Sequence, residues 1–208
     1  MSTKKRIRVQ SKRPDAHGSD PCNAVFLVGF MGAGKSSVGR ALGQRLNWTF
    51  EDLDDRIEHA EGRSVAEIFR DSGERGFRRA EHAALRQALK ELQGGDSRII
   101  ALGGGAFVQK RNAALLLTSG VPTVFLDAPV EELWRRCSLQ AVKSGAERPL
   151  LRSREQFDRL HASRSKSYEK ASHKVKTGDR TLNAVADEIA KMLRLRKTET
   201  RTKQGEVE

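Results

Sequence analysis

The segment Gly29–Ser36, GFMGAGKS, has three glycines, a lysine and a serine in the spacing GxxxxGKS. Glycines let the backbone curl so that successive N–H groups point at phosphate oxygens. Lys35 can then meet the β- and γ-phosphates of a nucleotide as a point charge, and the Ser36 hydroxyl can ligate Mg²⁺. The segment therefore predicts a site for ATP or GTP with magnesium, and it names no second substrate.

Two carboxylates, Asp52 and Asp54, closely follow the short apolar segment Trp48–Phe50. Residues two apart in an extended chain project to the same side, and ligands bind at the carboxyl ends of parallel strands. One hypothesis is that both carboxylates face the phosphate-binding loop, with Mg²⁺ and Lys35 balancing their charge. The other is a helix N-terminus, because Asp54 and Asp55 also stand where a helix cap belongs. The residues alone leave both hypotheses open.

A triple glycine, Gly103–Gly105, directly follows another apolar segment. Three consecutive glycines are costly in conformational entropy, so their position at the end of a strand favours a backbone that a small ligand approaches closely. A plain tight turn is the alternative. Arg78 lies in the segment FRRAE within a long helical pattern, and an arginine pair in such a place is commonly part of a solvated face.

The elements that position these residues alternate along the chain: apolar segments of strand length are separated by helical patterns. Continuous apolar strands separated by helices predict a parallel sheet covered on both faces. The predicted fold class is therefore α/β, doubly wound, in one domain. The segments expected to be strands are Ala24–Phe30, Trp48–Phe50, Ile99–Leu102, Thr123–Leu126 and the region of Val175.

Several helix ends are recognisable in the sequence. Ser64 followed by Glu67 has the spacing of a capping box, and Gly94 is suited to end a helix. Pro129 is suited to the first position of a helix. The polar stretch Ser138–Ser153 contains Gly145 and Pro149 and shows no clear period, so we predict a mobile loop there.

The length of 208 residues fits one domain whose core needs no disulfide or metal. No segment approaches the roughly 20 apolar residues of a membrane span, and residues 1–22 lack the apolar centre of a secretory signal. Cys22 and Cys137 stand far apart, outside any CxxC or His-rich context. This excludes a structural zinc site and favours a reducing compartment. We expect a cytoplasmic protein without a membrane partner.

The formal net charge of +12 is concentrated at the ends of the chain. Residues 1–22 hold six Lys/Arg and two Asp, and residues 191–208 hold six Lys/Arg and three Glu, so the two ends supply +7. We expect both ends to be disordered, because they lack periodic apolar residues. The remaining charge suits a polyphosphate ligand or nucleic acid. No nucleic acid partner is expected, because aromatic residues that would stack on bases do not alternate with the basic ones.

Taken together, the segments GAGKS, FEDLD, FRRAE and GGG, in this order and spacing, resemble bacterial shikimate kinases. The resemblance runs from about residue 24 to residue 193. A phosphate-binding loop alone is shared by many nucleotide hydrolases, whereas the combination of four segments is much more specific. Two later features agree with it: the segment RPLL at Arg148–Leu151, and Arg164 four residues before Tyr168.

The resemblance implies a nucleoside-monophosphate-kinase-like fold. It has a five-stranded parallel core, a helical substrate-binding insertion and a lid at about residues 138–154, within a domain over residues 23–193. Residues 1–22 and 194–208 are then the disordered ends. The implied reaction transfers the ATP γ-phosphoryl group to the 3-hydroxyl of shikimate, in the biosynthesis of chorismate and aromatic amino acids. The implied partners are ATP, Mg²⁺ and shikimate, and we expect a monomer.

The resemblance also implies a role for each site residue. Asp54 would bind the reacting hydroxyl, Arg78 and Arg164 would clamp the shikimate carboxylate, and Arg148 would close over ATP from the lid. Lys35, Asp54 and Arg148 are the catalytic candidates. The nucleotide-binding candidates are Gly32, Ala33, Gly34, Lys35, Ser36, Ser37 and Arg148; the magnesium candidates are Ser36 and Asp52; the shikimate-binding candidates are Asp54, Arg78, Gly103, Gly104, Gly105 and Arg164.

The sequence departs from the family near the adenine. Ala141 stands seven residues before the RPLL arginine, where members often carry an arginine, and Leu182 stands where they often carry a proline. Two other functions compete with the implied one. A kinase of another hydroxy acid such as gluconate would not need the FRRAE arginine, the triple glycine and Arg164 together. A basic nucleic-acid-binding module would use the ends of the chain.

Overall fold

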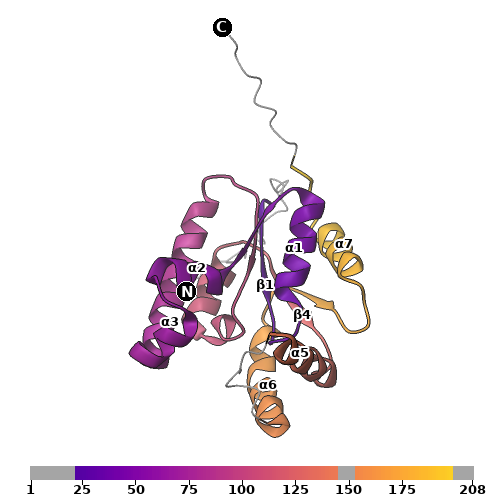
Figure 1. Cartoon of the computed structure of the whole chain (residues 1–208). Coiled ribbons are helices and arrows are strands. Elements are labelled where there is room, and N and C mark those ends of the chain that lie inside the picture. Colours follow the sequence, from indigo (N-terminus) through magenta and orange to yellow (C-terminus); the bar gives the residue numbers. More distant parts are fainter. Residues whose placement is uncertain (1–21, 145–152, 199–208) are drawn as a thin grey trace, which may run out of the picture.

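The computed structural model describes residues 22–144 and 153–198. Its centre is a parallel sheet with the strand order β2-β3-β1-β4-β5 (Figure 1). The α/β doubly wound fold class and the five-stranded parallel core are confirmed. The strands are β1 (Ala24–Val28), β2 (Thr49–Asp52), β3 (Arg98–Ala101), β4 (Thr123–Asp127) and β5 (His173–Lys176).

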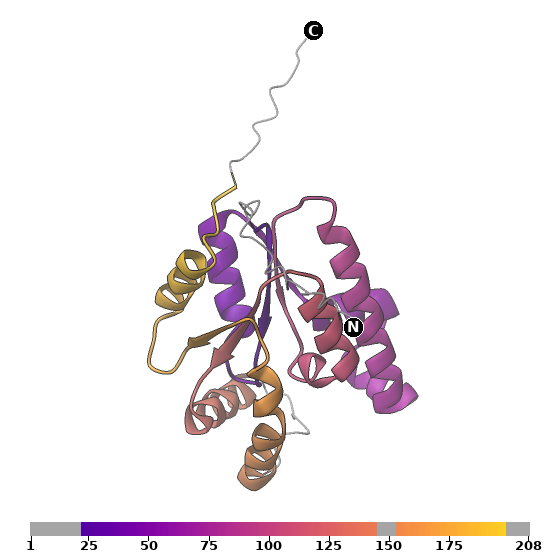
Figure 2. The same cartoon turned by 180° about the vertical axis from the view of Figure 1, so that it is seen from behind.

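Helices cover both faces of the sheet. In Figures 1 and 2, α1 and α7 lie together on one face, α2, α3 and α4 lie on the other, and α5 and α6 lie at the end where β1 and β4 finish. The helices are α1 (Lys35–Leu46), α2 (Leu53–Glu61), α3 (Val65–Leu92), α4 (Lys110–Thr118), α5 (Val130–Ser144), α6 (Arg154–Tyr168) and α7 (Leu182–Met192), and a 3₁₀ turn, η1, spans Ala106–Val108. None of the described helices is both long and apolar enough to cross a membrane.

The sheet interior explains why the apolar segments are continuous. Every residue of β1 is buried, with at most 1% of its surface exposed. A central strand with helices on both faces needs apolar side chains on both, so no alternation is expected. The chain moves from β1 to its β3 side first and to its β4 side later. This reversal creates a crevice at the carboxyl ends of the strands, where ligands of such sheets bind.

The predicted helix ends are largely confirmed. The Ser64 hydroxyl accepts a hydrogen bond from the Glu67 N–H at 3.2 Å, and the Glu67 carboxylate accepts one from the Ser64 N–H at 2.8 Å, which completes the capping box. Helix α3 ends at Leu92, two residues before Gly94. Pro129 precedes the first residue of α5 and its carbonyl accepts the first helical hydrogen bonds.

Two predicted boundaries are wrong. The loop predicted over Ser138–Ser153 begins too early, because α5 continues to Ser144; nothing before Gly145 breaks a helix. The C-terminal disordered end, predicted from residue 194, also begins too early. The Trp48 indole N–H donates to the Arg196 carbonyl at 3.1 Å, and the Thr198 N–H donates to the Leu46 carbonyl at 2.9 Å. Residues 1–21, 145–152 and 199–208 lie outside the described residues.

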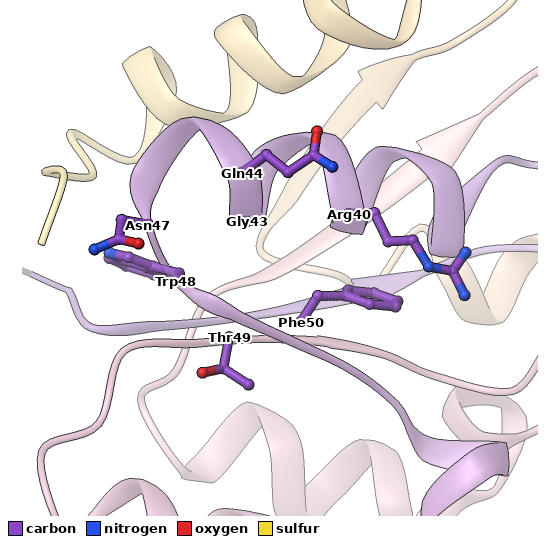
Figure 3. A pocket seen from close by; sticks show the side chains of 7 residues that line it. All are labelled: Arg40, Gly43, Gln44, Asn47, Trp48, Thr49 and Phe50. Atoms are coloured by element: carbon purple, nitrogen blue, oxygen red, sulfur yellow. The ribbon is translucent and has the colours of Figure 1, made fainter.

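Helix α1 packs tightly against the edge strand β2 (Figure 3). A Cβ atom on Gly39 would lie 2.3 Å from the Phe50 ring, so only glycine permits this approach. The Arg40 guanidinium lies over the same ring, 5.1 Å from its centre. A shallow groove of about 390 Å³ follows this contact at the surface. It is lined by Arg40, Gly43, Gln44, Asn47, Trp48, Thr49 and Phe50.

Candidate active site

The phosphate-binding loop joins the end of β1 to the start of α1, as the sequence predicts. Gly32 has a positive φ of 79°, and a Cβ atom there would lie 2.7 Å from the Leu133 carbonyl oxygen, so no other residue fits without a shift. Helix α1 begins at Lys35, which directs its N-terminal N–H groups and its positive dipole end at the loop.

The Lys35 side chain bonds back to the backbone of its own loop. Its Nζ donates to the carbonyl oxygens of Gly29 at 3.0 Å and Phe30 at 3.1 Å. Burial lowers the pKa of this ammonium group, and the nearby carboxylates of Asp52 and Asp54 act in the opposite direction. The single positive charge of Lys35 therefore lies near two negative charges, those of Asp52 and Asp54, on the β2 side of the crevice.

Asp52 has two contacts at once. Its Oδ1 accepts a hydrogen bond from the Asp54 N–H at 3.1 Å, which makes Asp52 the N-cap of α2, and its Oδ2 accepts one from the Ser36 hydroxyl at 2.7 Å. The expected extended geometry is wrong, because α2 already begins at Leu53. The cap hypothesis was right about a helix N-terminus and wrong about the residue, since Asp52 is the cap instead of Asp54 or Asp55.

Asp54 projects into the crevice from the first turn of α2. Its Oδ1 is buried and has no hydrogen-bond partner among the described residues. Burial, followed by the repulsion of Asp52, raises its pKa from 3.8 to about 6. A buried acceptor without a donor is costly in a folded protein and commonly marks a place for a ligand.

The cavity beside Asp54 holds about 260 Å³ and joins the two halves of the predicted site. Of the predicted nucleotide-binding residues, Ala33 is buried under the loop and does not line the cavity, and Arg148 lies outside the described residues. The lining residues are Met31, Gly32, Gly34, Lys35, Ser36, Ser37, Asp52, Asp54, Leu102, Gly103, Gly104 and Gln140.

The raised pKa of Asp54 predicts a pH-dependent cost in stability. Between pH 3.8 and about 6 the folded chain holds a proton that the unfolded chain releases, so the contribution of Asp54 to the free energy of unfolding falls as the pH rises through this window. Asp54→Asn is therefore expected to raise the free energy of unfolding at pH 7, by at most about 3 kcal/mol. The gain should shrink towards pH 4.

Urea unfolding of the wild type and of Asp54→Asn between pH 4 and pH 8 measures this difference. Asp55→Asn is the comparison variant: Asp55 is the exposed neighbour on the same helix, and its pKa is also raised, by burial and by Asp52, but less than that of Asp54, so its pH-dependent difference should be smaller. A difference between wild type and Asp54→Asn that stays constant over the whole pH range would contradict the raised pKa.

The triple glycine brings three predicted side chains to one backbone turn. A Cβ atom on Gly103 would lie 2.6 Å from Asp54 Oδ1, and one on Gly105 would lie 2.6 Å from Arg78 Nη2. A Cβ atom on Gly104 would have its nearest side-chain neighbour in Arg164, whose Nη1 would lie 3.8 Å away. None of these glycines has a positive φ. Glycine is therefore needed here because other side chains approach the backbone closely, and not because the backbone conformation is unusual.

Arg78 is not part of a solvated face. Only 16% of its side chain is exposed, and its Nη1 donates to Glu81 Oε1 at 2.9 Å. Glu81 is fully buried, and burial raises the pKa of its carboxyl group while Arg78 lowers it. Glu81 is the last residue of the segment FRRAE, and no role was predicted for it from the sequence. Its signal was the spacing of three residues from Arg78, which places both on one helix face.

Arg164 reaches the turn from the other side. Its guanidinium lies 5.9 Å from the centre of the Phe30 ring, on the phosphate-binding loop. One turn further along α6, the buried Tyr168 donates its hydroxyl hydrogen bond to the Gly104 carbonyl. Burial raises the pKa of Tyr168 to about 12, so it remains a donor at neutral pH. Tyr168 therefore holds the glycine turn in place beside Arg164.

Two further residues on α5 approach the site and were not predicted. Gln140 lines the cavity, and Arg136 donates to the carbonyl oxygens of Thr177 at 2.9 Å, Gly178 at 2.6 Å and Gly32 at 3.4 Å. Both lie on the helix face of the buried Leu133, three and seven residues after it. This helical spacing is the signal in the sequence that could have indicated both residues. It was not recognised because a loop was predicted from Ser138 onwards.

A phosphate-binding loop at the carboxyl end of a parallel sheet, facing a buried carboxylate and two arginines, defines a P-loop kinase of small molecules. The family model "Shikimate kinase" matches residues 31–194. A shikimate kinase of Persephonella marina is 33% identical over 171 residues, which cover 82% of this chain and 98% of that one. One of Thermus thermophilus is 39% identical over 176 residues, which cover 83% and 91%. The chain belongs to the shikimate kinase family.

Solved structures agree with this assignment. The shikimate kinase of Acinetobacter baumannii in complex with shikimate superimposes with a TM-score of 0.70 at 31% identity, covering 83% of this chain and 92% of that one. The enzyme of Aquifex aeolicus gives a TM-score of 0.70 at 34% identity, with 82% and 96% covered. A gluconokinase of Sinorhizobium meliloti, at 16% identity and a TM-score of 0.50, shares the fold alone. The predicted family, and with it the class of ATP-dependent phosphotransferase, is confirmed.

Proposed function

We propose that the chain transfers the γ-phosphoryl group of ATP to the 3-hydroxyl of shikimate, giving ADP and shikimate 3-phosphate. One observation carries the proposal: the triple glycine, of which Gly103 and Gly104 line the cavity beside the phosphate-binding loop, brings Asp54, Arg78 and Arg164 to one backbone turn. A carboxylate next to two guanidinium groups suits an acceptor that has both a hydroxyl and a carboxylate. The related enzyme of Acinetobacter baumannii binds shikimate.

The proposed nucleotide half of the site is the loop and the start of α1. Backbone N–H groups of Gly32, Ala33, Gly34, Lys35, Ser36 and Ser37 would hold the phosphates, with Lys35 moving from its loop carbonyls to the β- and γ-phosphates. Ser36 and Asp52 offer one hydroxyl and one carboxylate, the donor set that Mg²⁺ takes when phosphates and water complete its shell. When bound, Mg²⁺ neutralises charge on the transferring phosphoryl group.

The proposed acceptor half is built from Asp54, Arg78 and Arg164. Phosphoryl transfer passes through a loose transition state, so the protein mainly positions the two substrates and balances charge. The unpartnered Oδ1 of Asp54 would accept the hydrogen bond of the attacking hydroxyl. Arginine forks match a planar carboxylate with two parallel hydrogen bonds, which fixes the ring relative to Asp54.

Arg136 is our candidate for the adenine side. Because α5 continues to Ser144, Ala141 lies within this helix, and Arg136, more than one turn earlier, is the arginine that reaches the loop carbonyl of Gly32. We propose that Arg136 provides the arginine that other family members place near the adenine, and that Arg148 closes over ATP. The domain over residues 23–193, the lid at about 138–154, the monomer and the cytoplasmic location remain predictions.

Release of ADP by the purified chain with ATP, Mg²⁺ and either shikimate or gluconate tests this function. We expect release that depends on shikimate and is absent with gluconate at the same concentration. Release that depends on gluconate would identify the competing hydroxy-acid kinase. Hydrolysis of ATP that is indifferent to both acceptors would overturn the acceptor assignment and leave only the nucleotide half.

A further inference from the structure

Helix α4 holds the turn of α3 that carries Arg78, and the mechanism above does not use this contact. The Arg111 guanidinium donates to the backbone carbonyl of Arg78 at 2.7 Å. The next residue, Asn112, is fully buried, and its Nδ2 donates to Glu81 Oε2 at 3.4 Å. Two consecutive residues of α4 therefore fix both the backbone of Arg78 and the carboxylate that pairs with it.

The orientation of the Asn112 amide follows from its neighbours. Its other end, Oδ1, lies 2.7 Å from Nδ1 of His82. Turning the amide over would place its oxygen against the Glu81 carboxylate, where two acceptors would repel. With the nitrogen facing Glu81 and the oxygen facing His82, Nδ1 of His82 must carry a hydrogen. His82, Asn112 and Glu81 thus form one chain of donors and acceptors that ends at Arg78.

Arg78 bonds to two carboxylates at once, and this chain supports the buried one. Its Nη1 donates to the buried Glu81 at 2.9 Å, and its Nε and Nη2 each donate to the exposed Glu74 at 3.3 Å. A buried carboxylate needs donors on both oxygens, and Glu81 receives one from Arg78 and one from Asn112. Without Asn112, one oxygen would stay buried and unsatisfied, which weakens Glu81 as a partner and leaves the guanidinium held mainly by the exposed Glu74.

We propose that Asn112 and His82 are positioning residues that act through Glu81 to hold the Arg78 guanidinium beside Gly105, in the orientation that receives the acceptor carboxylate. The proposal deepens the proposed function and rests on it. It concerns residues that act through another side chain: Asn112 bonds to Glu81 on one side and to His82 on the other. Their effect should therefore appear in acceptor binding and leave the ATP half of the site unaffected.

Asn112→Leu removes the amide while keeping a side chain of similar size. We expect KM for shikimate to rise about tenfold, as for the loss of one buried hydrogen bond to a charged group, with KM for ATP and kcat within a factor of two. Thr118→Val is the matched control, because within the described part of the chain the Thr118 hydroxyl bonds only to carbonyls of its own helix α4. An equal rise in both KM values, or none in either, would overturn the proposal.

A second measurement does not depend on turnover. ¹⁵N-detected NMR of the wild type should show the ring of His82 protonated at Nδ1, and Asn112→Leu should shift it towards the Nε2–H form. His82→Gln identifies the signal among the five histidines of the chain. A wild-type His82 with a hydrogen only on Nε2 would overturn the network. If the wild type instead shows the Nδ1–H form but does not phosphorylate shikimate, the proposed function fails and the network stands.

Discussion

Replacing Asp54 by asparagine is expected to lower kcat with shikimate by about 10²–10⁴-fold and to leave KM for ATP within a factor of about two. The reason lies in where each carboxylate points. Asp52 is held by the Ser36 hydroxyl and by the N–H of Asp54, so it belongs to the loop side of the cavity. Asp54 Oδ1 has no donor among the described residues and faces the glycine turn, where an acceptor hydroxyl would lie.

The pH profile sharpens this test. Since the pKa of Asp54 is raised to about 6 in the unliganded chain, the ionised form that accepts the hydroxyl hydrogen bond is lost below that pH. We expect kcat/KM for shikimate to fall as the pH decreases through about 6 in the wild type, and this fall should disappear in Asp54→Asn. Steady-state kinetics with each substrate varied separately measures both effects.

Asp55→Asn serves as the control, because this substitution removes the same charge on the exposed side of the same helix turn. It should retain the activity and pH profile of the wild type. If Asp54→Asn instead loses affinity for ATP and Mg²⁺ while a residual kcat remains high, Asp54 belongs to the metal-binding side with Asp52.

Arg78→Lys is expected to raise KM for shikimate by about 10–100-fold, with a change in KM for ATP of less than about twofold. A lysine keeps the charge but offers a single ammonium group, which cannot match a planar carboxylate with two parallel hydrogen bonds. It would also leave Glu81, fully buried and paired with Nη1 of Arg78, without a partner of the same reach.

Arg79→Lys is the matched control for this variant. Arg79 is the exposed neighbour of Arg78, and it forms no ion pair within the described parts of the chain. Its replacement should leave both KM values unchanged. Gly105→Ala is an independent test of the same role, since the added Cβ atom would displace the Arg78 guanidinium without removing it. A normal KM for shikimate in both Arg78→Lys and Gly105→Ala would exclude the carboxylate clamp.

The sequence alone was sufficient for the features that depend on neighbouring residues. The phosphate-binding loop is one such feature, because its glycines, Lys35 and Ser36 act through the backbone of a single turn and the helix that follows it. The parallel sheet is another, since continuous apolar strands are required wherever helices cover both faces. The capping box at Ser64 is local in the same sense.

Tertiary structure decided the features that depend on residues far apart in the chain. The separate directions of Asp52 and Asp54 follow from the helix that starts at Leu53, and from the distant Ser36 that bonds to Asp52. The triple glycine could be predicted as a close approach, but not that Asp54 and Arg78 are what approaches it.

The same holds for Glu81, Arg136 and Asn112, whose side chains look ordinary in the sequence. Glu81 receives one of its two donors from Asn112 on the distant helix α4, and Arg136 donates to the carbonyls of Thr177 and Gly178, which lie about 40 residues further along the chain. Burial and pairing of a charged group are properties of several elements packed together, so no segment of the sequence contains them by itself.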